Sequence, residues 1–117
     1  MTRNVAARGL CVVLITCPSK PVALKLARWM IRGHAAACVN VLGPAESIFW
    51  WQGRVDHARE YLLIVKTARQ NLPALRRGLT ARHPYTVPEL VALPISDGLP
   101  AYLDWVRSSC RSKKSAL

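Results

Sequence analysis

Hydrophobic and polar positions along the chain follow two periods, one typical of strands and one typical of helices. Residues 10–16 form a continuous apolar run rich in β-branched side chains, which predicts a strand near the sheet centre that is covered on both faces. Ser19 is a suitable N-cap for the helix that follows, and we expect Gly33 to end it. The apolar positions of this helix recur at helical spacing and are Ala23, Leu26, Ala27, Met30 and Ile31.

Residues 37–67 have the pattern of a long β-hairpin with two strand-like arms. Gly43-Pro44 interrupts the first arm, where the chain should bend or bulge. Gln52-Gly53 predicts the turn between the arms. Residues 54–60 are polar, and we expect them to be exposed, whereas residues 61–67 read as a second buried strand.

The next segment predicts a second amphipathic helix. Asn71 is a suitable N-cap, and His83-Pro84 should end the helix, because the residue before a proline disfavours helical dihedrals. The apolar positions expected to face inward are Leu72, Leu75 and Leu79.

A last strand and a short helix complete the pattern. The strand is predicted over residues 90–95, and Asp97-Gly98 then turns the chain into the helix. The side chains of this helix expected to be buried are Tyr102, Leu103, Trp105 and Val106.

The order β-α-β-β-α-β, followed by one extra C-terminal helix, predicts the α+β class with a ferredoxin-like fold. Crossover rules make the sheet four-stranded and antiparallel, with both main helices on one face. The strands are apolar on both sides, so the face without helices needs a cover. We expect another subunit to supply it.

The chain has 117 residues, which predicts one folded domain. We place this domain at residues 10–107, between a basic N-terminal tail at residues 1–9 and a basic C-terminal tail at residues 108–117. The formal net charge of +11 favours association with anions such as nucleic acid, acidic membrane surfaces or phosphorylated metabolites. The alternative is that these charges only solvate the surface.

Several classes of protein are disfavoured by the composition. No apolar run approaches the roughly 20 residues that span a bilayer, so we expect no membrane helix. The four cysteines form no C-x-x-C pair, which disfavours a zinc knuckle and fits reduced thiols in the cytoplasm. Residues 61–65 are largely aliphatic where an RNA-recognition motif has stacking rings, so we expect no specific nucleic-acid binding. No orienting acid is evident for a cysteine–histidine nucleophile, and we predict that the protein is not an enzyme.

Short motifs in the chain, taken together and in order, resemble the CutA family, which is named for divalent cation tolerance. The resemblance covers about residues 10–107, and the combination is specific although each piece alone is weak. The matching pieces are Thr16-Cys17-Pro18, Ala36-Ala37-Cys38-Val39-Asn40, Ser47-Ile48, Trp51-Gln52-Gly53, Lys66-Thr67, His83-Pro84-Tyr85, Val87-Pro88-Glu89, Leu93-Pro94-Ile95, and Gly98 with Tyr102-Leu103-Asp104-Trp105.

The resemblance implies a homotrimer of ferredoxin-like subunits in which the long hairpin completes a neighbour's sheet. It implies a role in divalent cation tolerance and response to metal ions, with copper(II) bound in some members and no cofactor required. The alternative that the resemblance leaves open is a PII-like signalling or scaffold trimer that binds a small anionic ligand in the cleft between subunits.

The family resemblance also implies a ligand pocket made of rings, one cation and one carboxylate. Such a mixture suits a small anionic or aromatic ligand. The alternative is that the rings form a subunit interface and that the lysine and the glutamate form an ion pair. The implied pocket residues are Trp51, Lys66, Tyr85, Glu89, Tyr102 and Trp105.

For a metal ion, the resemblance implies His83 as the imidazole ligand and Cys17 and Cys38 as the available thiols. The chain departs from copper-binding relatives at two positions, because it has Ile15 before the first motif and Arg82 before His83. A positive charge at Arg82 would disfavour a bound cation.

Overall fold

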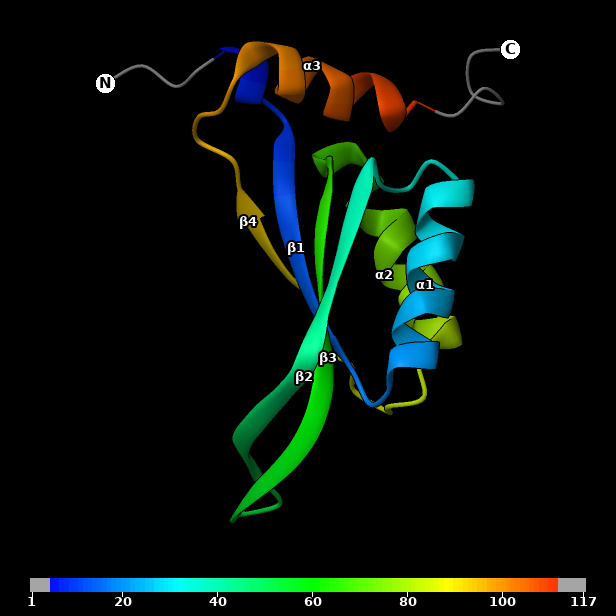
Figure 1. Ribbon diagram of the computed structural model, residues 1–117, viewed down its shortest axis with the longest axis vertical. Coiled ribbons are helices and arrows are strands. Elements are labelled where there is room, and N and C mark those ends of the chain that lie inside the picture. Colours follow the sequence, from blue (N-terminus) through cyan, green and yellow to red (C-terminus); the bar gives the residue numbers. More distant parts are fainter. Residues whose placement is uncertain (1–4, 112–117) are drawn as a thin grey trace.

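The computed structural model describes residues 5–111, which form a four-stranded antiparallel sheet with two helices on one face (Figure 1). The sheet order is β2-β3-β1-β4. The strands are β1 (Leu10–Cys17), β2 (Cys38–Trp51), β3 (Arg54–Ala68) and β4 (Val91–Pro94). The helices are α1 (Lys20–Arg32), α2 (Leu72–Arg82) and α3 (Pro100–Ser109), with short 3-10 helices η1 (Val5–Ala7) and η2 (Arg69–Asn71). The predicted α+β class and element order are confirmed.

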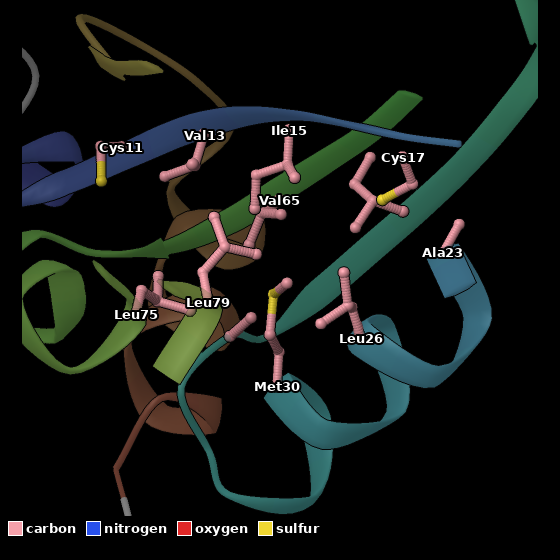
Figure 2. Close-up of a cluster of buried hydrophobic side chains, with 12 residues drawn as sticks. Cys11, Val13, Ile15, Cys17, Ala23, Leu26, Met30, Val65, Leu75 and Leu79 are labelled. Carbon is pink, nitrogen blue, oxygen red and sulfur yellow. The ribbon is translucent and has the colours of Figure 1, made fainter. Parts of the chain in front are cut away.

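The main core lies between the sheet and the helices α1 and α2, which share one face of it (Figure 2). Every second residue of β1 points into this core, because side chains alternate between the two faces of a strand. Val13, Ile15 and Cys17 are completely buried there. Met30 of α1 and Leu75 of α2 are completely buried opposite them. The prediction of a central, fully buried first strand is therefore confirmed on this face.

The hairpin of β2 and β3 extends well beyond the rest of the molecule (Figure 1). Its turn is formed by Gln52 and Gly53, with φ of 50° and 77°. Two consecutive positive φ values match the right-handed twist of the arms, and glycine tolerates such a φ at little cost. The register shifts between Leu42 and Ala45, so the predicted bulge is present.

Two expected helix caps differ from the structure. Gly33 follows α1, but its φ is −89°, and His34 is the residue with a positive φ, of 57°. Asn71 makes no cap bond to α2. Its side-chain amide instead donates to the His34 carbonyl oxygen at 3.3 Å and to Thr67 Oγ1 at 3.3 Å. Asn71 therefore connects the loop after α1 to the end of β3.

Helix α3 covers one end of the sheet and not a face (Figure 1). It forms a second small core with η1 and the ends of β1 and β3. Residues 5–9 and Cys110 belong to this folded part, so the predicted tails are shorter than expected. Residues 108 and 109 form the end of α3, and Arg111 follows it. The other tail residues, 1–4 and 112–117, lie outside the described part of the chain. The buried members of this second core are Ala7, Leu10, Ala68, Leu103, Val106 and Cys110.

Two rings of α3 are more exposed than predicted. Tyr102 is 43% exposed and Trp105 is 46% exposed, whereas Leu103 and Val106 are buried as expected. The helix has a single buried side, because it rests on the edge of the sheet instead of lying between two layers. Within residues 5–111 the helices are too short or too polar to cross a bilayer.

Candidate functional site

His83 lies at the end of α2 and is held against β1 by both of its ring nitrogens. Nε2 is 2.8 Å from the carbonyl oxygen of Thr16, so it bears the proton and donates it. Nδ1 accepts the backbone N–H of Tyr85 at 3.1 Å. The ring is 7% exposed and lies against the Tyr85 ring, with the centroids 4.8 Å apart. The two hydrogen bonds define a neutral imidazole that fastens the loop after α2 to the sheet.

Glu60 belongs to the same group of side chains, and the prediction that it is exposed is wrong. It is 7% exposed, and its Oε2 accepts the hydroxyl of Tyr85 at 2.8 Å. Burial, followed by this hydrogen bond, raises the pKa of Tyr85 to about 12. The only signal in the sequence was the position of Glu60 directly before the apolar run of β3.

Cys17 is completely buried beside this group. Burial, and then the nearby charge of Glu60, raise the pKa of the Cys17 thiol to about 11. Metals and electrophiles react with the thiolate, so the environment holds this sulfur in its unreactive form. Within one chain, Cys17 therefore has the properties of a structural side chain of the main core.

The three predicted metal ligands do not meet in one chain. Cys17 pairs with Tyr61 and Cys38 pairs with Lys66, so the two thiols lie roughly 16 Å apart along β3. They also point to opposite faces, because the neighbour Val39 packs on the main core. Within residues 5–111 no three side chains of histidine, cysteine, aspartate or glutamate are close enough to hold an ion.

The two departures from the copper-binding pattern have structural roles of their own. Ile15 is completely buried in the main core. The guanidinium of Arg82 lies over the ring of Trp29, 4.3 Å from its centroid, and donates to the carbonyl oxygen of Gly78 at 3.2 Å. Ile15 therefore packs between the sheet and the helices, whereas Arg82 connects α2 to α1.

A second polar group, which we call the Lys66 cluster, lies at the opposite end of the sheet and consists of Cys38, Asn40, Lys66, Tyr102 and Trp105. Lys66 Nζ donates to Asn40 Oδ1, and the Cys38 thiol donates to the same oxygen at 3.8 Å. Burial, followed by the proximity of Cys38, raises the pKa of Tyr102. The rings of Tyr102 and Trp105 are 5.5 Å apart. The cluster combines a cation, an amide and two partly exposed rings on the face that α1 and α2 leave open.

The six predicted pocket residues are therefore divided among four places in one chain. Three of them, Lys66, Tyr102 and Trp105, lie together in the Lys66 cluster. Tyr85 binds Glu60, and Glu89 lies just before β4. Trp51 is at the hairpin tip, roughly 40 Å along β3 from Lys66. Lys66 is paired with Asn40 and not with Glu89.

Large apolar side chains are exposed on two surfaces. On the hairpin tip, Ile48 and Trp50 are each 75% exposed. On the open face of the sheet, Val91 is 47% and Leu93 is 48% exposed. A monomer seldom exposes apolar surface on this scale, and such surfaces mark contacts with other proteins. The apolar open face predicted from the strand pattern is confirmed.

These features agree with the comparisons to known proteins. A family model described as CutA1 divalent ion tolerance protein matches residues 11–109. The divalent-cation tolerance protein CutA of Thermus thermophilus is 49% identical over 98 residues, which cover 84% of this chain and 95% of that protein. A solved structure of the divalent cation tolerance protein from Thermus thermophilus superposes with a TM-score of 0.84 at 48% identity, covering 86% of this chain and 97% of that one.

One of the plant relatives is a longer protein than this chain. Protein CutA 1 of Oryza sativa, named chloroplastic, is 44% identical over 100 residues, which cover 86% of this chain but 56% of the rice protein.

The sheet, the helices on one face and the long hairpin define a ferredoxin-like α+β protein. The chain belongs to the CutA1 divalent ion tolerance family. The resemblance found in the sequence motifs is confirmed, and the family is named for tolerance and not for a catalysed reaction.

Proposed function

We propose that the protein acts in divalent cation tolerance as a homotrimer and not as an enzyme. The observation that supports this most directly is the presence of two separate exposed apolar surfaces on each chain. One is the hairpin tip with Trp50 and Trp51, and the other is the open face with Val91 and Leu93. Different surfaces that fit each other make head-to-tail contacts, which close into a ring when the rotation allows. The number three rests on the resemblance to the CutA family.

Native mass spectrometry tests the assembly. We expect the wild type at about 10 µM to give one species of about three times the chain mass of 13.0 kDa. The double variant Trp50→Ser/Trp51→Ser should be monomeric, because both rings are exposed in the single chain and their loss removes apolar contact area. As a matched control, Ile31→Ser changes an exposed side chain on α1 and should stay trimeric. A monomeric wild type, or a trimeric double variant, would contradict the proposal.

Copper is the ion we propose for the assembly, because thiol and imidazole ligands favour it. Cys38 is the partly exposed thiol among the candidate ligands, whereas Cys17 is completely buried. His83 becomes available only if its bonds to Thr16 and Tyr85 open. The predicted cytoplasmic location belongs to the same proposal, and the chloroplastic name of the rice relative applies to that protein.

A second candidate function, a PII-like sensor of a small anion, is favoured by the Lys66 cluster. Lys66 offers an ammonium group beside the rings of Tyr102 and Trp105, and a neighbouring chain would complete a cleft around them. Tyr85, Glu89 and Trp51 would have to reach that cleft from other copies, because one chain does not bring them there.

The mass spectrum of protein purified from cells distinguishes the two candidates. Copper that is present in the wild type, absent from Cys38→Ser and present in Cys17→Ser supports the metal role. A retained organic anion that is lost in Lys66→Ala supports the sensor. Copper that persists in Cys38→Ser would place the metal elsewhere and contradict the first assignment.

A further inference from the structure

An arginine-lined pocket lies beneath α3 at the same end of the sheet as the Lys66 cluster, and at the end opposite to Glu60 and His83. None of the residues of the Lys66 cluster lines it. Its volume is about 570 Å³. Three segments that are distant in the sequence meet there: the residues before β1, the end of β3 with the 3-10 helix η2 that follows it, and the end of α3. Its lining residues are Arg8, Gly9, Ala68, Arg69, Gln70, Arg107 and Arg111.

Backbone and side-chain bonds hold the pocket in shape. The backbone N–H of Arg69 donates to the Gly9 carbonyl oxygen at 2.7 Å. Arg107 Nη1 donates to the Ala6 carbonyl oxygen at 2.9 Å, and its Nη2 donates to the Arg8 carbonyl oxygen. The second small core lies beneath these segments. The floor is therefore formed before any ligand arrives, which lowers the entropy cost of binding.

The charges that line the pocket are of one sign. Four arginines line it, and none of its lining residues within 5–111 is acidic. Arg107 lies 4.0 Å from the carboxylate of Asp104, an exposed side chain of α3 outside the lining. Arg8, Arg69 and Arg111 are exposed. Like charges gathered with little counter-charge repel one another, and an anion placed between them relieves this repulsion.

We propose that this pocket binds a small phosphorylated anion carrying two or more phosphate groups. Guanidinium groups are planar forks that bind phosphate oxygens in pairs, and the three exposed ones, of Arg8, Arg69 and Arg111, suit more than one phosphate. The volume lies in the range of small-molecule sites and suits a diphosphate or a nucleotide. No aromatic side chain lines the pocket in the described residues, so it lacks the stacking surface that single-stranded nucleic acid uses.

Isothermal titration calorimetry with inorganic pyrophosphate and with ADP, in about 150 mM NaCl, tests the proposal. We expect micromolar binding of pyrophosphate to the wild type. The variant Arg69→Gln/Arg111→Gln should bind at least about ten-fold more weakly, because it removes two exposed guanidinium groups and keeps the backbone bond of Arg69. Arg107 is left intact, since it holds the N-terminal segment.

The matched control Arg76→Gln/Arg77→Gln removes the same charge from the exposed side of α2, outside the pocket, and should change the affinity less than about two-fold. If ADP binds more than about ten-fold tighter than pyrophosphate, the pocket recognises a nucleotide. If the two affinities are equal, it recognises the phosphate groups alone. Both results support the site. No binding at about 1 mM, equal weakening in both double variants, or binding of a short RNA without binding of pyrophosphate would overturn it.

Discussion

Replacing Ile15 with alanine is expected to lower the free energy of unfolding by about 3 kcal/mol. Ile15 is the largest of the completely buried side chains, and it lies in the central strand β1 facing both helices. Removing its methyl and methylene groups loses their transfer free energy and leaves a cavity that rigid neighbours on three elements cannot close. Urea unfolding at one fixed protein concentration measures the change, because association also contributes to stability.

The control for this variant is Ile31→Ala, which makes the same chemical change at a side chain that is 42% exposed on α1. We expect it to cost about 1 kcal/mol or less, because less apolar area leaves water there on folding. Equal losses in the two variants would mean that the burial of β1 does not govern stability.

The second large effect is expected at Gly78 of α2, where alanine should lower the free energy of unfolding by about 1–3 kcal/mol. On an exposed helix the same change normally stabilises by about 1 kcal/mol, so the sign is reversed here. A Cβ at Gly78 would lie 2.0 Å from Cζ2 and 2.2 Å from Cη2 of Trp29. The ring would have to move, and its contact with the Arg82 guanidinium would be lost.

Thermal or urea unfolding of two further variants separates this clash from other causes. In a Trp29→Leu background, Gly78→Ala should become neutral or stabilising, since the ring that blocks the Cβ is absent. Arg77→Ala, at an exposed position of the same helix, should change stability by no more than about 0.5 kcal/mol. Destabilisation by Gly78→Ala that persists without Trp29 would contradict this explanation.

Much of the fold could be predicted because its signals are local. The continuous apolar run of β1, the helical spacing in α1 and the Gln52-Gly53 turn each depend on neighbouring residues, so the elements follow from the chain itself. The sheet order then follows from chain connectivity, since few arrangements satisfy the crossover rules. Even the open apolar face was predictable, because both sides of the strands are hydrophobic.

The candidate sites could be predicted only in part, because they depend on partners distant in the sequence. Glu60 is buried because Tyr85 arrives from a later loop and donates to it. Cys17 and Cys38 are separated because β3 lies between their strands in the sheet. The family motifs indicate which residues matter but contain no distances between them.

By itself, therefore, the sequence determined the elements, the sheet topology, the family and the need to cover one face. The tertiary structure alone decided that Lys66, Tyr102 and Trp105 share a cluster, that His83 has no free ring nitrogen in one chain, and that four arginines surround one pocket. The physical reason is range. Backbone preferences and hydrophobic periodicity act between near neighbours, whereas burial, charge and hydrogen bonding at a site arise from segments that only folding brings together.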